Sequence, residues 1–101
     1  MSATGTAARI VTFPLEGRVD ASTASALRAA LHQTVLDGHG PLALDLGAVS
    51  QLDAVGLGVL VGAYESAHRR GRALTVVNAP RRIAAILRLA GLARVLRAPA
   101  A

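Results

Sequence analysis

The chain of 101 residues suits one compact domain, and its hydrophobic content of 52% suffices for a core of small aliphatic side chains. It contains no cysteine, which excludes disulfides and thiolate metal sites. No stretch approaches the roughly 20 apolar residues of a membrane helix, and the first residues lack the pattern of a signal peptide. We therefore expect a cytoplasmic domain without membrane insertion.

The net charge of +5 comes from 11 basic residues, all of them arginine. Two clusters stand out, Arg69-Arg70-Arg72 and Arg81-Arg82. Such clusters suit an acidic protein surface or nucleic acid. Because no aromatic residues interleave with them and no helix-turn-helix pattern is visible, we expect no direct contact with nucleic acid.

The first half of the chain reads as strand, helix, strand. Residues 9–15 alternate like a strand, and Asp20 to Thr23 offers capping side chains for a helix over 24–35. Gly38 is a natural terminator for that helix. Residues 42–46 (L-A-L-D-L) then alternate as a short buried strand.

The second half continues the alternation. Apolar residues recur at helical spacing over 56–69, and a strand follows at 73–77. Asn78 is a candidate cap for a helix over 83–90. Residues 93–97 fit a last short strand.

Alternating strands and helices imply right-handed crossovers and a mostly parallel sheet. The fold class is therefore α/β, with a mixed, largely parallel sheet of four or five strands and helices packed on it. We expect one domain over 1–101, with an ordered core over about 9–97 and flexible tails at 1–8 and 98–101. An unprotected sheet edge near the N-terminus is one consequence, and a homodimer through it would be a remedy.

Catalytic groups are scarce. The histidines, His32, His39 and His68, have no metal-ligand spacing. Asp45 and Asp53 are the only carboxylates near strand ends, and Asp53 is placed to cap the next helix. No nucleophile has a base beside it, so we expect neither an enzyme nor a cofactor or metal site.

The glycines of V-G-L-G (55–58) match no phosphate-binding motif. Gly58 and Gly62 are four residues apart, with Ser66 four further on, so they form a stripe of small residues on one helix face. Glycine in a helix costs about 1 kcal/mol relative to alanine. Close approach of another backbone would offset that cost, either within the domain or from a partner.

Four segments in this order resemble the STAS domains of bacterial anti-sigma factor antagonists. They are E-G-R-V-D (16–20), L-A-L-D-L-G-A-V (42–49), L-D-A-V-G-L-G-V-L (52–60) and L-A-G-L-A-R-V-L (89–96). The resemblance covers nearly the whole chain, from about Arg9 to Leu96. It implies a protein-binding switch that captures an anti-sigma factor, usually a serine kinase, until that kinase phosphorylates a Ser or Thr at the start of the second helix.

The chain departs from that family at the acceptor itself. The acceptor position is Val55, and neither Val55 nor Ala54 carries a hydroxyl, so no phosphorylation is expected there. Ser50, in the preceding loop, is the alternative acceptor. The resemblance implies a partner-binding surface that comprises Asp20, Ser50, Asp53, Ala54, Val55, Gly56, Leu57 and Gly58.

Three functions remain open from the sequence. The first is an antagonist that phosphorylation cannot switch off. The second is a STAS scaffold subunit of a transporter or sensory complex, with no link to sigma factors. The third is a small-molecule sensor that uses the turn near residues 50–57.

Overall fold

A parallel sheet of three strands forms the centre of the fold in the computed structural model, which describes residues 9–96. The strands β1 (Val11–Val19), β2 (Leu42–Leu52) and β3 (Leu74–Val77) lie in the order β1-β2-β3, and both pairs are parallel. The predicted α/β class is confirmed. The predicted tails at 1–8 and 98–101 lie outside the described residues.

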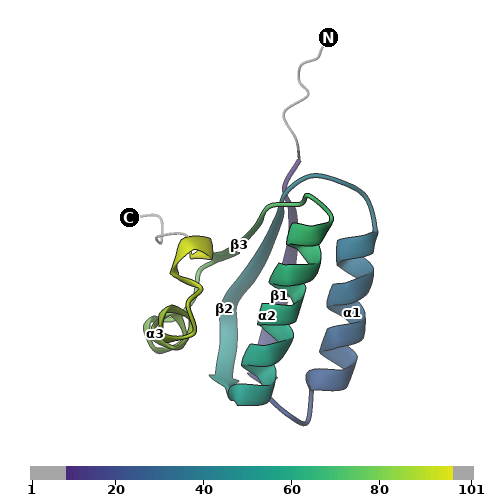
Figure 1. Cartoon of the computed structure of the whole chain (residues 1–101). Coiled ribbons are helices and arrows are strands. Elements are labelled where there is room, and N and C mark those ends of the chain that lie inside the picture. Colours follow the sequence, from purple (N-terminus) through teal and green to yellow (C-terminus); the bar gives the residue numbers. More distant parts are fainter. Residues whose placement is uncertain (1–8, 97–101) are drawn as a thin grey trace.

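Three helices alternate with these strands: α1 (Ala24–Leu36), α2 (Ala54–Arg69) and α3 (Arg81–Leu89). α1 and α2 run side by side over one face of the sheet, while α3 lies apart from them on the β3 side (Figure 1). Their apolar stripes meet the buried leucines of β2 in a single core. Helical periodicity in the sequence therefore located all three helices, within a few residues at each end.

β1 and β2 are longer than the sequence predicted. β1 continues past Pro14 to Val19, and β2 continues through the expected loop to Leu52. β1 has only one neighbour among the described strands, so it tolerates the missing amide of Pro14, and the register shifts immediately after that residue. Because Val19 pairs with Leu52, both strands end together.

The predicted last strand at 93–97 is wrong in its described part. Ala93–Val95 form a short 3-10 helix, and Leu96 makes a single parallel bridge to Val76. After Gly91, which ends α3 with φ of +85°, Leu92 and Val95 turn inward and are buried. The described sheet accordingly has three strands rather than four or five.

Two predicted helix caps are also wrong. Asn78 has φ of +59° and precedes a helix whose N-cap is Pro80, so its side chain caps nothing. Thr23 is the N-cap of α1 but makes no side-chain capping bond. Its hydroxyl oxygen accepts the Asp20 amide at 3.1 Å instead, and the hydroxyl donates to the Arg18 carbonyl at 2.9 Å. Instead of capping a helix, the Asn78 amide donates to Asp45 of β2 and the Thr23 hydroxyl donates to the backbone of β1.

The sequence suggested a surface cluster of Arg69, Arg70 and Arg72, but Arg72 does not belong to it. Its side chain is buried, with 4% of its surface exposed. The guanidinium donates hydrogen bonds to five backbone carbonyls at the end of α1 and in the turn after it, those of Thr34, Val35, Asp37, His39 and Gly40. Arg72 therefore fastens the end of α1 to the start of β3.

β1 occupies an edge of the described sheet, since its only partner there is β2. The homodimer expected through this edge stays a prediction. Within residues 9–96, no helix combines the length and apolar character that crossing a bilayer requires.

Candidate functional site at the start of α2

The predicted site lies where β1 and β2 end side by side. The amide of Asp53 donates to the Val19 carbonyl at 3.3 Å, which joins the two strand ends directly. Asp20 follows β1, and Asp53 follows β2 and begins α2. In parallel sheets the carboxyl ends of the strands are where binding residues gather. The segments that the sequence placed in one site are therefore brought together in space.

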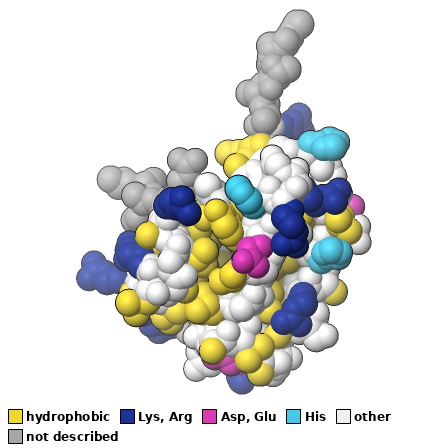
Figure 2. All heavy atoms as spheres, viewed as in Figure 1, with side chains coloured by type: hydrophobic (Ala, Val, Ile, Leu, Met, Phe, Trp, Pro, Cys, Tyr) yellow, Lys and Arg dark blue, Asp and Glu magenta, His cyan; other side chains and the backbone are white. Residues whose placement is uncertain are grey.

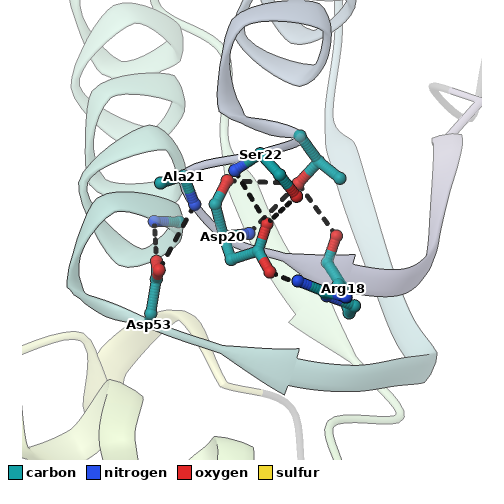
Figure 3. A network of polar contacts seen from close by, with 7 residues as sticks. Arg18, Asp20, Ala21, Ser22 and Asp53 are labelled. Carbon is teal, nitrogen blue, oxygen red and sulfur yellow. Dashed lines mark hydrogen bonds and ion pairs between the residues drawn. The ribbon is translucent and has the colours of Figure 1, made fainter.

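Asp53 joins the two segments through its carboxylate (Figure 3). One oxygen accepts the Gly56 amide at 2.8 Å, which confirms the predicted N-cap of α2. The other accepts the amide of Ala21 at 3.2 Å, across 32 residues of sequence. One of the free amides of the first turn of α2, that of Gly56, is thus already occupied by a carboxylate of the chain itself.

Asp20 is buried. Figure 3 shows the polar contacts that its neighbours make with it. Its carboxylate accepts the Ser22 hydroxyl at 2.6 Å and the Ser22 amide at 2.9 Å, and it pairs with the Arg18 guanidinium at 2.9 Å. The Ser22 hydroxyl first, and then Arg18, lower the pKa of Asp20 from 3.8 to about 2. These contacts are internal to the domain, and a role for Asp20 toward a partner stays a prediction.

The lowered pKa of Asp20 predicts a contribution to stability that depends on pH. A carboxyl whose pKa falls on folding stabilises the fold fully above its unfolded pKa and loses that contribution as pH falls through the folded pKa. For Asp20 this interval runs from 3.8 down to about 2. Ser22→Ala removes the largest cause, so we expect the Asp20 pKa to move back toward 3.8 in NMR titration of its carboxyl carbon.

The matched control for this titration is Ser25→Ala, which removes an exposed hydroxyl one turn further along. It should leave the Asp20 titration as in the wild type. Urea unfolding between pH 2 and pH 4 should show a weaker pH dependence for Ser22→Ala than for Ser25→Ala. Identical curves for the two variants would show that the Ser22 hydroxyl does not stabilise the ionised carboxyl.

Of the eight residues predicted to contact a partner, five present exposed surface: Ser50, Asp53, Ala54, Val55 and Gly58. Val55 is the large apolar member of this set and is 44% exposed in the first turn of α2. Leu57 is half-buried and packs against the core. An apolar side chain is therefore presented to solvent at the position where the family resemblance placed a hydroxyl.

Gly56 is buried and has a steric role. A Cβ atom built on it would lie 2.0 Å from the Val19 carbonyl oxygen and 2.6 Å from the Val19 carbonyl carbon. The first turn of α2 thus rests directly on the backbone end of β1. Only glycine permits this approach.

Sequence reasoning missed the part played by Arg82. Its guanidinium donates to the Ser50 carbonyl and so ties α3 to the end of β2. Beside this contact lies an open groove of about 410 Å³, which runs between the strand ends and α3. It is lined by Asp20, Ser50, Gln51, Leu52, Asp53, Arg82, Ile83 and Ile86. The two partners are 32 residues apart, and no local pattern marks such a pair.

The carboxylates of this site are bound by groups of the domain itself. No group of three or more potential metal ligands occurs among residues 9–96. Asp20 and Asp53 both hold backbone amides. The Ser22 hydroxyl donates to Asp20 at 2.6 Å, but a carboxylate whose pKa is lowered to about 2 is a poor general base for that hydroxyl. The exposed first turn of α2 and the adjoining groove suit contact with another molecule.

Comparison with known proteins agrees with this geometry. Two relatives, the anti-sigma-B factor antagonists of Listeria monocytogenes serovar 1/2a and Listeria innocua serovar 6a, are each 32% identical to the chain over 80 residues. Each alignment covers 79% of this chain and 70% of the relative.

Solved structures share the fold at lower identity. The anti-sigma factor antagonist SpoIIAA in its unphosphorylated form matches with a TM-score of 0.77 at 16% identity, over 95% of this chain and 84% of its own. A sulfate transporter family protein from Wolinella succinogenes matches with a TM-score of 0.73 at 20% identity, over 86% and 75%. A family model described as "Mlab, STAS domain" matches residues 3–97. The chain therefore belongs to the STAS domain family.

Proposed function

We propose that this chain is a cytoplasmic antagonist that binds an anti-sigma factor of the serine-kinase type through the exposed first turn of α2. Binding would free a sigma factor without any turnover by the chain itself. The relatives at 32% identity are anti-sigma-B factor antagonists, and they support this class of function. The observation that carries the proposal is the exposure of Val55 at the start of a helix whose cap and backbone support are complete.

Val55 also shapes the proposed regulation. A phosphate adds a charge of about −1.5 to −2. An apolar contact would strip that charge of its hydration, and the neighbouring carboxylate would repel it, so the contact would be lost. Valine offers no acceptor, so the contact would not end by phosphorylation at this position. We infer control by the abundance of the chain or by competing partners. Ser50, whose side chain is exposed and whose carbonyl is bound by Arg82, is the nearest alternative acceptor.

Val55→Asp is expected to abolish capture of the anti-sigma factor. The substitution places a charge in the apolar contact and beside Asp53, so affinity should fall by about 100-fold or more. The measurement is a pull-down from native lysate with identification by mass spectrometry, followed by calorimetry with the purified partner. Since Val55 is exposed, the variant should keep its unfolding midpoint.

The matched control is Val11→Asp. Val11 is 43% exposed, as Val55 is 44%, but it begins β1 at the opposite end of the parallel sheet. The control should bind the partner like the wild type. If both variants lost affinity for the partner equally, the added negative charge would explain the loss wherever it lies on the surface. Recovery of a kinase-type factor by Val55→Asp as well would refute the proposed surface.

Val55→Thr is expected to create the missing switch. Threonine approximates the shape of valine and adds one hydroxyl at an exposed helix start. Incubation with the captured kinase and Mg-ATP should give a singly phosphorylated product that no longer binds, while the wild type stays unmodified. Phosphorylation of the wild type, at Ser50 or elsewhere in the surface, would contradict the proposal that phosphorylation cannot end its contact with the partner. A variant that binds but is never phosphorylated would contradict a kinase partner.

A second candidate is a scaffold subunit of a membrane-associated transport complex. The family resemblance leaves this candidate open, because some STAS proteins of the lipid-transport type play such roles. The chain matches a family model described as "Mlab, STAS domain" rather than one named for sigma-factor regulation. The same pull-down separates the two candidates. Recovery of transporter components, with no anti-sigma factor and with little effect of Val55→Asp, would select the scaffold.

A further inference from the structure

A second groove, of about 210 Å³, runs between α1 and α2. We call it the α1–α2 groove. Its floor is apolar and formed by the buried residues Leu31, Val35, Val59 and Ala63. Its remaining lining is Arg28, His32, Gly58, Gly62, Ser66 and Arg69. The groove therefore combines an apolar floor with basic side chains contributed by both helices.

The charge of this groove has one sign. No carboxylate is among its lining residues. Arg28 and Arg69 are exposed, and the only ion pair among residues 9–96 joins Arg18 to Asp20 elsewhere. Figure 2 shows arginine and histidine side chains over the α1–α2 side of the molecule, with an acidic side chain beside them and further arginines over the other side. A surface of one sign with unpaired cations selects for an acidic partner.

The glycines of α2 add a steric argument. A Cβ atom built on Gly58 or on Gly62 would meet nothing within 4 Å, whereas one on Gly56 would strike β1. The packing of the domain itself thus gives no reason for the two exposed glycines. Glycine is less stable than alanine inside a helix. Their absent side chains leave room for another backbone to approach α2 closely.

We propose that the α1–α2 groove receives an acidic amphipathic helix of a partner protein. From Gly58 to Arg69 the groove follows α2 for about 16 Å at 1.5 Å per residue, which is about three turns of a docked helix. Small apolar residues of that helix would face the glycines and the apolar floor. Its flanking Asp and Glu side chains would reach Arg28 and Arg69.

Two other occupants are disfavoured by the residues present. Within residues 9–96, a second copy of the chain offers no acidic helix, because α1 and α3 lack Asp and Glu and α2 contains only Glu65. Single-stranded nucleic acid binds on aromatic platforms, and no aromatic side chain lines the groove. The proposal goes beyond the antagonist function and does not require it.

The test uses a synthetic helical peptide with alanine and leucine on one face and glutamate on both flanks. The peptide is titrated into the isotope-labelled full chain and followed by amide NMR shifts. We expect the shifts to map to α1 and α2 around Gly62, and Arg69→Glu to weaken binding by about tenfold or more. Gly62→Leu, which fills the groove, should weaken it similarly.

The matched control is Arg88→Glu, the same charge change at an exposed position on α3 outside the groove. It should change affinity by less than about twofold. Equal losses for Arg69→Glu and Arg88→Glu, equal binding of a peptide with lysine in place of glutamate, or shifts spread over α3 would each overturn the proposal. Tighter binding of a single-stranded RNA in the groove would overturn it as well.

A photoreactive amino acid at position 62 extends the test to the cell. A crosslink to an Asp- and Glu-rich helical segment supports the proposal, and a crosslink only to a second copy of the chain overturns it. Because the peptide titration involves no anti-sigma factor, its failure is distinct from failure of the antagonist function. The Val55→Asp pull-down can likewise fail while the peptide binds.

Discussion

Gly56→Ala is expected to destabilise the domain by about 3 kcal/mol or more, a large part of the stability of a domain of this size. The added methyl group would lie 2.0 Å from a backbone oxygen of Val19. A clash with backbone is not relieved by changing a rotamer, so either the first turn of α2 or the end of β1 must move. Moving either also disturbs the bonds that Asp53 makes to Gly56 and Ala21.

The same helix supplies the control. Gly62→Ala adds the same methyl group where nothing lies within 4 Å. Alanine is the better helix former, so the free energy of unfolding should rise by about 0.5–1 kcal/mol. Urea unfolding of both variants measures the difference. Equal stability of Gly56→Ala and the wild type would mean that the first turn of α2 does not rest on β1 as described.

Most of the architecture followed from local sequence patterns. Apolar residues at helical spacing identify α1, α2 and α3, and Gly38, Gly71 and Gly91 mark their ends, with φ between +70° and +85°. What failed depended on partners distant in sequence. β2 extends through residues 47–52 because β1 pairs with it there, although the segment G-A-V-S-Q-L alone does not read as a strand.

The candidate site shows the same division. Asp53 three residues before Gly56 is a local signal, and it correctly predicted the cap of α2. Three further contacts each join segments 32 residues apart. They are the bond of Asp53 to the Ala21 amide, the bond of Arg82 to the Ser50 carbonyl and the bond of Arg72 to the Gly40 carbonyl. In the sequence both arginines looked like surface charge, because nothing near them marks their acceptors.

Arg72→Met is expected to cost about 3 kcal/mol or more of stability, which for one residue outside the apolar core is a large effect. The guanidinium is buried and donates five hydrogen bonds at 2.7 to 3.3 Å. Its positive charge lies at the C-terminal end of α1, where the helix dipole favours a cation. Methionine fills much of the space but leaves those carbonyls without their donor.

Two further variants, Arg72→Lys and Arg70→Met, separate the effect of the hydrogen bonds from the effect of the positive charge when their urea unfolding is measured. Lysine keeps the charge but cannot reproduce the planar fork of donors, so we expect an intermediate loss. Arg70 is exposed, and its replacement should change stability by less than about 0.5 kcal/mol. If Arg72→Met lowered the free energy of unfolding no more than Arg70→Met does, the five hydrogen bonds would stabilise the fold no more than hydration of the same groups. Arg72 follows the C-terminal end of α2, whereas Val55 lies in the first turn of that helix. Variants of Arg72 should therefore still bind the partner while folded, so a loss of stability and a loss of capture can be told apart.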